Sequence, residues 1–312
     1  MATSDPLNDK LITVLGGGGF LGRYVAQALL KRGVRLRVAS RDPQQAFSLK
    51  PLAELGQLQI GRCDITDPRQ IASALAGADG VVNLVGSFSG DQKALMGHAA
   101  GQVAEAARTA GARGMVHMSA IGADTDSPAV YGQAKALGEQ LVMQGFAQAT
   151  VLRPSVIFAE DDNFINMFAG LIEALPMLPV FAPDACLQPV FADDVADAVA
   201  AALADPASHG GKTYELAGPV TTSMIELNRR IAAAQHRRRR FIRIPDAASA
   251  LFAALPLTPM TRDQWALLKQ GNCASGQLPG FDALGITPRP LELFLDKWME
   301  RYRHHGRFAA TT

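Results

Sequence analysis

The chain has 312 residues, of which 48% are hydrophobic, and 30 Lys and Arg against 29 Asp and Glu give a formal net charge of +1. This composition provides apolar side chains for one or two packed domains and excludes a disordered chain. The balance of charge excludes nucleic acid as the main partner, because polyanion-binding domains carry a clear excess of Lys and Arg.

The first half alternates between short aliphatic runs and longer Ala-rich segments with apolar residues at helical spacing. Strands are expected at Leu11–Leu15, Leu36–Ala39, Leu58–Ile60, Gly80–Val85, Met115–Met118 and Thr150–Leu152. Helices are expected at Gly19–Arg32, Pro68–Ala76, Ala94–Ala110 and Tyr131–Met143. Strands that alternate with helices predict an α/β fold with a Rossmann-type, doubly wound parallel sheet.

After Pro154 the rhythm changes, because repeated prolines break the chain into irregular pieces. A helix at Asp193–Ala204 and a strand at Thr213–Leu216 are expected to return to the sheet. We therefore expect a core at residues 1–155, to which 190–217 returns. Residues 156–189 and 218–312 would form a smaller, mainly helical region that serves as a lid, a substrate region or a docking region.

The three cysteines, Cys63, Cys186 and Cys273, lie far apart and outside any Cys-x-x-Cys or Cys/His pattern. This usage predicts a reducing compartment, with neither a disulfide framework nor a metal site. Residues 1–10 resemble neither a signal peptide nor a transit peptide, and no apolar run reaches the roughly 18 residues of a membrane span. We expect a cytoplasmic protein without a transmembrane segment, which could still lie against the membrane surface.

A glycine-rich turn follows the first expected strand and opens the first expected helix. It contains Gly16-x-x-Gly19-x-x-Gly22, and in a second frame Gly17-x-Gly19-x-x-Gly22. Glycines allow a sharp turn and a close backbone approach to a pyrophosphate, whose charge is then met by the helix N-terminus. The turn therefore predicts a dinucleotide site that includes Phe20 and Leu21.

The end of the second strand indicates which dinucleotide is bound. An NAD site usually carries Asp or Glu there, whereas this chain has Ser40 followed by Arg41. A guanidinium suits a 2′-phosphate, and Arg23 could assist, so NADP(H) is favoured over NAD(H). The alternative is a solvated Arg41, with Asp42 binding the ribose.

Tyr131 and Lys135 are four residues apart at the start of an expected helix, so their side chains share a face. An ammonium beside the phenol is expected to lower the pKa of Tyr131 and to favour proton transfer to or from a carbonyl.

Together these segments resemble the extended and atypical branches of the short-chain dehydrogenase/reductase superfamily, which includes the NAD-dependent epimerase/dehydratase proteins. The resemblance implies that Asp64 and Ile65 lie by the adenine, Leu84 and Val85 by the pyrophosphate and ribose, and Lys135 on the nicotinamide ribose. It also implies a cofactor contact at Ser155, in Arg153-Pro154-Ser155.

The chain departs from the superfamily where a Ser or Thr normally binds the substrate oxygen. That residue is expected one or two positions beyond Ser119, where this chain has Ala120 and Ile121. Two alternatives stay open. Either Ser119, or Thr125 or Ser127 in its place, substitutes and acts with Tyr131 and Lys135 in catalysis, or Tyr131 and Lys135 serve mainly as cofactor ligands.

The second half resembles the NADPH-binding accessory subunits of respiratory complex I and their bacterial relatives. The segments that carry this resemblance are Leu152–Phe158, Glu160–Asn166, Gln188–Val190, Thr261–Gln264 and Leu278–Pro288. The resemblance implies tightly held NADPH, a structural or redox-sensing role without demonstrated catalysis, and a C-terminal part near the membrane.

A basic run, Arg237–Arg240, precedes the apolar segment Ala247–Leu257. Such a pair is typical of a membrane-surface or docking element, or alternatively of a solvated helix end before a core helix.

Two functions therefore compete. The first is a non-catalytic accessory or assembly subunit of complex I, at the inner face of the cytoplasmic membrane. The second is an active NADPH-dependent reductase, epimerase or dehydratase on a small, quinone- or isoprenoid-like substrate.

Overall fold

The computed structural model describes residues 5–246 and 262–304. Within them the chain forms two compact units, which are described separately. Among the described residues, unit 1 comprises 5–154, 192–216 and 275–287, and unit 2 comprises 155–191, 217–246, 262–274 and 288–304. Among the described residues, no helix combines the length and the apolar character needed to cross a membrane.

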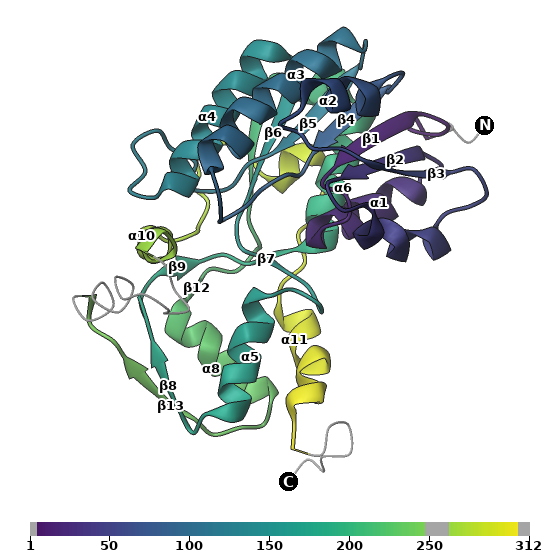
Figure 1. Ribbon diagram of the computed structural model, residues 1–312. Helices are drawn as coiled ribbons and strands as arrows, with labels where there is room; N and C mark the ends of the chain where they lie inside the picture. Colours follow the sequence, from purple (N-terminus) through teal and green to yellow (C-terminus); the bar gives the residue numbers. More distant parts are fainter. Residues whose placement is uncertain (1–4, 247–261, 305–312) are drawn as a thin grey trace. The chain divides into compact units, whose positions relative to one another are not determined.

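Unit 1 is built on a seven-stranded parallel sheet in the order β11-β6-β5-β4-β1-β2-β3 (Figure 1). Its strands are β1 (Leu11–Leu15), β2 (Arg35–Ser40), β3 (Leu58–Arg62), β4 (Gly80–Asn83), β5 (Gly114–Met118), β6 (Ala149–Pro154) and β11 (Thr213–Leu216). The central strands are buried along their whole length, as expected for a parallel sheet covered on both faces. The expected Rossmann-type fold is therefore confirmed.

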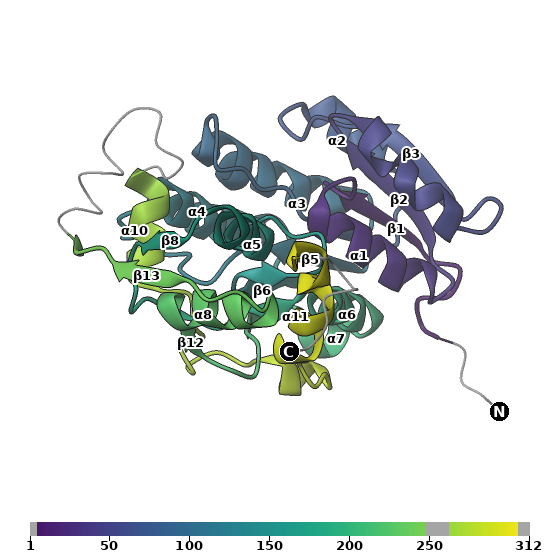
Figure 2. The same cartoon turned by 90° about the horizontal axis from the view of Figure 1, so that it is seen from below.

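Helices cover both faces of this sheet (Figures 1 and 2). They are α1 (Phe20–Leu30), α2 (Pro68–Leu75), α3 (Ala99–Thr109), α4 (Val130–Gly145), α6 (Ala192–Ala204) and α7 (Pro206–His209), with the shorter turns η1 (Pro43–Leu52), η2 (Lys93–His98) and η3 (Phe281–Leu284). Helices α1 and α6 pack together, and α3 packs on α4. The α3–α4 contact is close, because a Cβ at Gly101 would lie 2.8 Å from the Leu141 Cβ.

The described residues of unit 2 form three short strand pairs and several helical segments around an apolar core. The pairs join β7 (Ile157–Phe158) to β10 (Val190–Phe191), β9 (Cys186–Leu187) to β12 (Thr222–Ser223), and β8 (Met177–Val180) to β13 (Arg240–Arg243). The helices are α5 (Phe164–Ala174), α8 (Met224–Ala234), α10 (Arg262–Gln270) and α11 (Glu292–Trp298), with η4 at Met299–Tyr302. Aromatic rings, including Phe158, Phe191 and Trp298, pack in this core.

Two expectations need correction. Cys186 and Cys273 form a disulfide, although the sequence predicted none, because the fold places β9 beside the segment that follows α10. Residues 275–287 join unit 1, since Glu215 at the sheet edge donates its N–H to the Pro279 carbonyl and accepts hydrogen bonds from Ser275.

The basic run is partly structural. Arg237 donates to the Tyr302 carbonyl and Arg239 to the Ile172 carbonyl, so these two guanidinium groups fasten segments of unit 2. The apolar segment Ala247–Leu257 and Thr261 lie outside the described residues.

Candidate functional site

The glycine-rich turn connects β1 to α1 at the carboxyl edge of the sheet. Gly16 has φ +78°, a conformation that favours glycine, and a Cβ there would lie 3.3 Å from Val85 Cγ2. A Cβ at Gly22 would lie 2.5 Å from the Gly17 Cα, so α1 and the turn approach too closely for any side chain. The glycines at positions 16 and 22 are therefore required by geometry.

The N-terminus of α1 is suited to an anion. Gly19, its N-cap, supplies no side chain to bind the first N–H groups, and the first turn, beginning with Phe20 and Leu21, holds no acidic residue. Unsatisfied N–H groups and the helix dipole together favour a phosphate at such an end.

This turn lies where the strand order reverses, since β1 pairs with β2 on one side and β4 on the other. The Leu84 N–H donates to the Leu15 carbonyl (3.0 Å), so the chain after β4 continues alongside the turn. Asn83 shapes this segment by accepting a hydrogen bond from the Val85 N–H (3.1 Å). Dinucleotides bind at such switch points in open α/β sheets.

At the end of β2 the Asp42 carboxylate is already engaged. It accepts hydrogen bonds from the Gln44 N–H (3.1 Å) and the Gln45 side chain (3.2 Å), and so caps η1. The Ser40 hydroxyl donates to the Asp42 carbonyl (2.8 Å).

Asp64 follows β3 and binds Thr66 through the backbone N–H and the hydroxyl. These two hydrogen bonds, and to a lesser degree the charge of Arg41, hold its pKa below the usual value. Arg41 and Asp64 both follow the carboxyl ends of the paired parallel strands β2 and β3, which places them in one region of this edge. Ile65 is 4% exposed and packs in the core of unit 1, and Arg23 is half-buried on α1.

Lys135 on α4 is buried and reaches the ends of two strands. Its Nζ donates to the Met118 carbonyl (2.8 Å) and lies 3.5 Å from where a Cβ at Gly86 would stand. Desolvation lowers its pKa to about 8, against the opposing charge of Glu139.

Tyr131 lies one turn earlier on α4, with Lys135 Nζ 5.8 Å from its ring centroid. Phe88, which is 56% exposed, stacks on it with ring centroids 4.4 Å apart. Desolvation raises the pKa of Tyr131 to about 12. The expectation of a lowered pKa was wrong, because at this distance the charge of Lys135 does not outweigh burial of the phenol.

The Ser119 hydroxyl is bound to a carboxylate that the sequence analysis did not single out. It donates to Glu139 Oε1, and Arg153 binds the same carboxylate through Nε (2.8 Å) and Nη2 (2.6 Å). Glu139 lies one turn beyond Lys135 on α4, so a search for buried acids at helical spacing from Lys135 would have found it.

Two buried polar side chains, Asn83 and His117, lie within the sheet of unit 1. Asn83 and His117 face one another across β4 and β5, with Nδ2 and Nδ1 3.4 Å apart, and His117 Nε2 has no partner among the described residues. Desolvation lowers the pKa of His117 to about 3, so its imidazole is neutral. Ser155 belongs to unit 2, where its hydroxyl donates to the Gln188 carbonyl.

The structure thus brings together the turn at Gly16–Gly22, the Leu84–Val85 segment and the Arg41–Asp64 pair along the carboxyl edge of unit 1. Lys135 and Tyr131 lie at the ends of the neighbouring strands β4 and β5. This set fits a dinucleotide, with the phosphates at α1, the adenosine toward β2 and β3, and the nicotinamide toward α4.

Comparison with known proteins agrees with this geometry. A family of proteins described as NAD(P)H-binding matches residues 16–206. The mouse protein named NADH dehydrogenase (ubiquinone) 1 alpha subcomplex subunit 9, mitochondrial, is 30% identical over 93% of this chain and 80% of its own length. The proteins of the same name from Arabidopsis thaliana and Dictyostelium discoideum are 29% and 34% identical, over 94% and 66% of this chain. The match spans 78% of the Arabidopsis protein but only 58% of the Dictyostelium protein.

Solved structures support the fold. An epimerase from Methanothermobacter thermautotrophicus has a TM-score of 0.72 at 17% identity, covering 95% of this chain and 92% of its own. A nucleoside-diphosphate-sugar epimerase from Staphylococcus aureus has a TM-score of 0.71 at 16% identity, covering 91% and 99%.

Proposed function

Because the chain belongs to the NAD(P)H-binding proteins and to the family of complex I 1 alpha subcomplex subunit 9, we propose a function for it within that family. The proposal is that the chain binds NADP(H) and serves as a non-catalytic accessory subunit of respiratory complex I. Unit 1 is the proposed cofactor domain and unit 2 the proposed docking domain. The observation that carries the non-catalytic part is the hydrogen bond from Ser119 to Glu139.

The residues present fit a dinucleotide. The N–H groups at the start of α1 would hold the pyrophosphate, and Lys135 would bind the nicotinamide ribose through the protons that Met118 leaves free. When bound, reduced nicotinamide supplies a hydride.

The preference for NADP(H) is supported by the residues after β2. The carboxylate of Asp42, the alternative partner for a ribose hydroxyl, already caps η1, and the neighbouring Arg41 is exposed. A guanidinium binds a phosphate through charge-assisted hydrogen bonds that contribute about 1.5–3 kcal/mol.

Arg41→Ala is therefore expected to weaken NADPH binding by roughly 10- to 100-fold and to leave NADH binding nearly unchanged. Arg35→Ala, at the other end of β2, is the matched control because Arg35 is paired with Asp9. Titration of both nucleotides by fluorescence measures the effect. Equal losses for NADPH and NADH would overturn the assignment of Arg41 to the 2′-phosphate.

Three features support the absence of turnover. The Ser119 hydroxyl donates its hydrogen bond to the Glu139 carboxylate, and burial raises the pKa of the Tyr131 phenol to about 12. Phe88 also stacks on the Tyr131 ring. A general acid works best with a pKa near the working pH, so Tyr131 is poorly matched to that role. Oxidation of NADPH that depends on an added quinone or carbonyl compound and disappears in Tyr131→Phe would establish the competing reductase.

Docking is supported by an exposed apolar surface in unit 2. Met167 and Leu171 lie one turn apart on α5, and Met177 and Ile242 are exposed on the β8–β13 pair. Arg240, which shares a face of β13 with Ile242, is exposed beside them. Apolar side chains next to a cation suit a contact with complex I at the inner face of the cytoplasmic membrane, which bears anionic lipids.

Leu171→Glu is expected to reduce co-purification of the chain with complex I from solubilised membranes. Leu55→Glu is the matched control, because Leu55 is fully exposed in unit 1. Undiminished co-purification of Leu171→Glu would exclude this surface as the docking site, and failure of the wild-type chain to co-purify would overturn the accessory function.

A further inference from the structure

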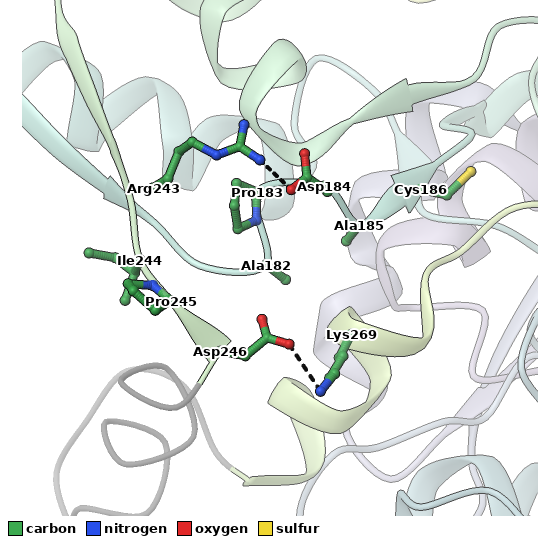
Figure 3. Close-up of a pocket in the computed structure, with 10 residues that line it drawn as sticks. All are labelled: Ala182, Pro183, Asp184, Ala185, Cys186, Arg243, Ile244, Pro245, Asp246 and Lys269. Carbon is green, nitrogen blue, oxygen red and sulfur yellow. Dashed lines mark hydrogen bonds and ion pairs between the residues drawn. The ribbon is translucent and has the colours of Figure 1, made fainter.

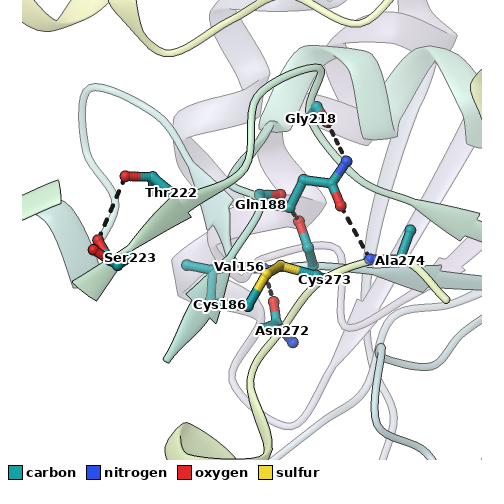
Figure 4. The surroundings of a disulfide bond; sticks show 10 residues. Val156, Cys186, Gln188, Gly218, Thr222, Ser223, Asn272, Cys273 and Ala274 are labelled. Carbon is teal, nitrogen blue, oxygen red and sulfur yellow. Dashed lines mark hydrogen bonds between the residues drawn. A yellow bond between two sulfur atoms is a disulfide. The ribbon is translucent and has the colours of Figure 1, made fainter. Parts of the chain in front are cut away.

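The disulfide between Cys186 and Cys273 lies within unit 2 and has no part in the proposed function. It joins β9 to the segment that follows α10, 87 residues later, with the two Cα atoms 6.0 Å apart (Figure 4). Cys186 is exposed and Cys273 half-buried, so a small reagent can reach the pair.

Hydrogen bonds hold the two cysteine segments together independently of the disulfide. The Asn272 N–H donates to the Cys186 carbonyl (2.7 Å), and the Gln188 N–H donates to the Asn272 carbonyl (3.2 Å). The Gln188 side chain accepts from the Ala274 N–H (3.0 Å) and donates to the Gly218 carbonyl (2.8 Å), while Asn272 Oδ1 accepts from the Val156 N–H. Figure 4 shows the bonds of the Gln188 side chain to Ala274 and Gly218 and the bond between Asn272 and Val156.

These contacts determine how the pair would behave when reduced. Because backbone and amide hydrogen bonds hold Cys186 and Cys273 within bonding distance, both thiols would remain neighbours, and closure would be an intramolecular step. In a reducing compartment, protein disulfides are usually transient and redox-sensing. A pair that is exposed and held in place in this way is suited to reversible oxidation.

We propose that Cys186 and Cys273 are a reversible redox pair that exchanges with small-molecule disulfides of the glutathione class. The exposed Cys186 thiolate attacks one sulfur of the small disulfide, forms a mixed disulfide and releases one thiolate. The Cys273 thiolate then displaces the second small thiolate from Cys186. The two cysteines lose two electrons and two protons, and the small disulfide becomes two thiols.

Cys186 lies close to α10, which packs on unit 2 through Trp265 and Leu268. Lys269 of α10 and Asp246 form an ion pair (3.0 Å) and line an open pocket of about 550 Å³, with Asp184 and Arg243 on its opposite side (Figure 3). The exposed Cys186 stands at the edge of that pocket.

The proposal is tested on the folded full-length chain in buffers of defined reduced and oxidised glutathione. Free thiols are alkylated without denaturant and counted by intact mass. We expect two alkylated cysteines in the reduced state and none in the oxidised state, with the same midpoint in both directions. Cys63 serves as an internal control, because it is buried and its pKa is raised to about 11.

Two variants distinguish a disulfide that exchanges with glutathione from a disulfide that serves only as a structural bond. Cys273→Ser is expected to take up one glutathione on Cys186, whereas Cys63→Ser should titrate like the wild type.

Two results would overturn the proposal. One is a pair that stays fully reduced in the most oxidising buffer while circular dichroism shows a folded chain. The other is a disulfide that glutathione opens only after denaturant is added, which would make it a permanent structural bond.

Discussion

Replacement of Glu139 tests the buried network beneath the candidate site. The Glu139 carboxylate accepts two hydrogen bonds from Arg153 and one from Ser119, and its side chain is 11% exposed against 23% for Arg153. Glu139→Ala would leave a largely buried guanidinium without its main partner. Such a loss costs about 3–5 kcal/mol.

The lower end of that range applies here, because Glu215 and Asp124 also stabilise the charge of Arg153. We therefore expect about 3 kcal/mol, which lowers the Tm of a domain the size of unit 1 by roughly 6–12 °C. Ser119→Ala, which removes only the hydroxyl, should cost about 1 kcal/mol.

The assay is urea unfolding of the cofactor-free protein, followed by circular dichroism. Glu105→Gln is the control, since this carboxylate is exposed on α3. The double variant Glu139→Met with Arg153→Met should recover most of the stability, because an apolar pair can replace a buried ion pair at little cost. A loss below about 0.5 kcal/mol in Glu139→Ala, or losses that simply add in the double variant, would refute the account of this network.

Three further predictions concern packing and pH. Gly22→Ala should destabilise unit 1 by about 1–3 kcal/mol and weaken nucleotide binding, because the new Cβ would lie 2.5 Å from the Gly17 Cα. The control Gly61→Ala, which has nothing within 4 Å of the new Cβ, should change the free energy of unfolding by less than about 0.5 kcal/mol. Equal effects of the two variants in urea unfolding would contradict this prediction. Gly170→Ala, in the interior of α5 with open space at the Cβ, should raise stability by up to about 1 kcal/mol, and a loss on thermal unfolding would count against the described packing. The pKa of His117 is lowered from 6.5 to about 3 in the folded chain, so the unfolded chain binds the extra proton first as the pH falls. The free energy of unfolding should therefore fall as the pH drops from about 6.5 toward 3, and His117→Met should lack this part of the acid sensitivity. Parallel acid-unfolding curves for the two proteins would show that His117 is not buried and neutral.

Local patterns predicted the fold core well. Aliphatic runs bounded by glycine marked the six strands from β1 to β6, and the glycine-rich turn marked the start of α1. Both signals are local, because strand burial and turn geometry depend on residues close together in the chain.

Features that depend on distant residues were not predicted. The Cys186–Cys273 bond joins residues 87 apart, which the pairing of Leu187 with Asn272 and the hydrogen bonds around it bring together. The pKa of Tyr131 depends on burial that the Tyr131–Lys135 spacing does not reveal, and the Ser119–Glu139 contact joins the end of β5 to α4.

The central claim, an NADP(H)-binding accessory subunit of complex I, is tested most directly by native mass spectrometry of complex I isolated through a tag on this chain. We predict a complex that contains the chain in stoichiometric amount and releases one NADP(H) per copy. A tagged chain recovered without complex I subunits, or without any bound nicotinamide dinucleotide, would contradict the account.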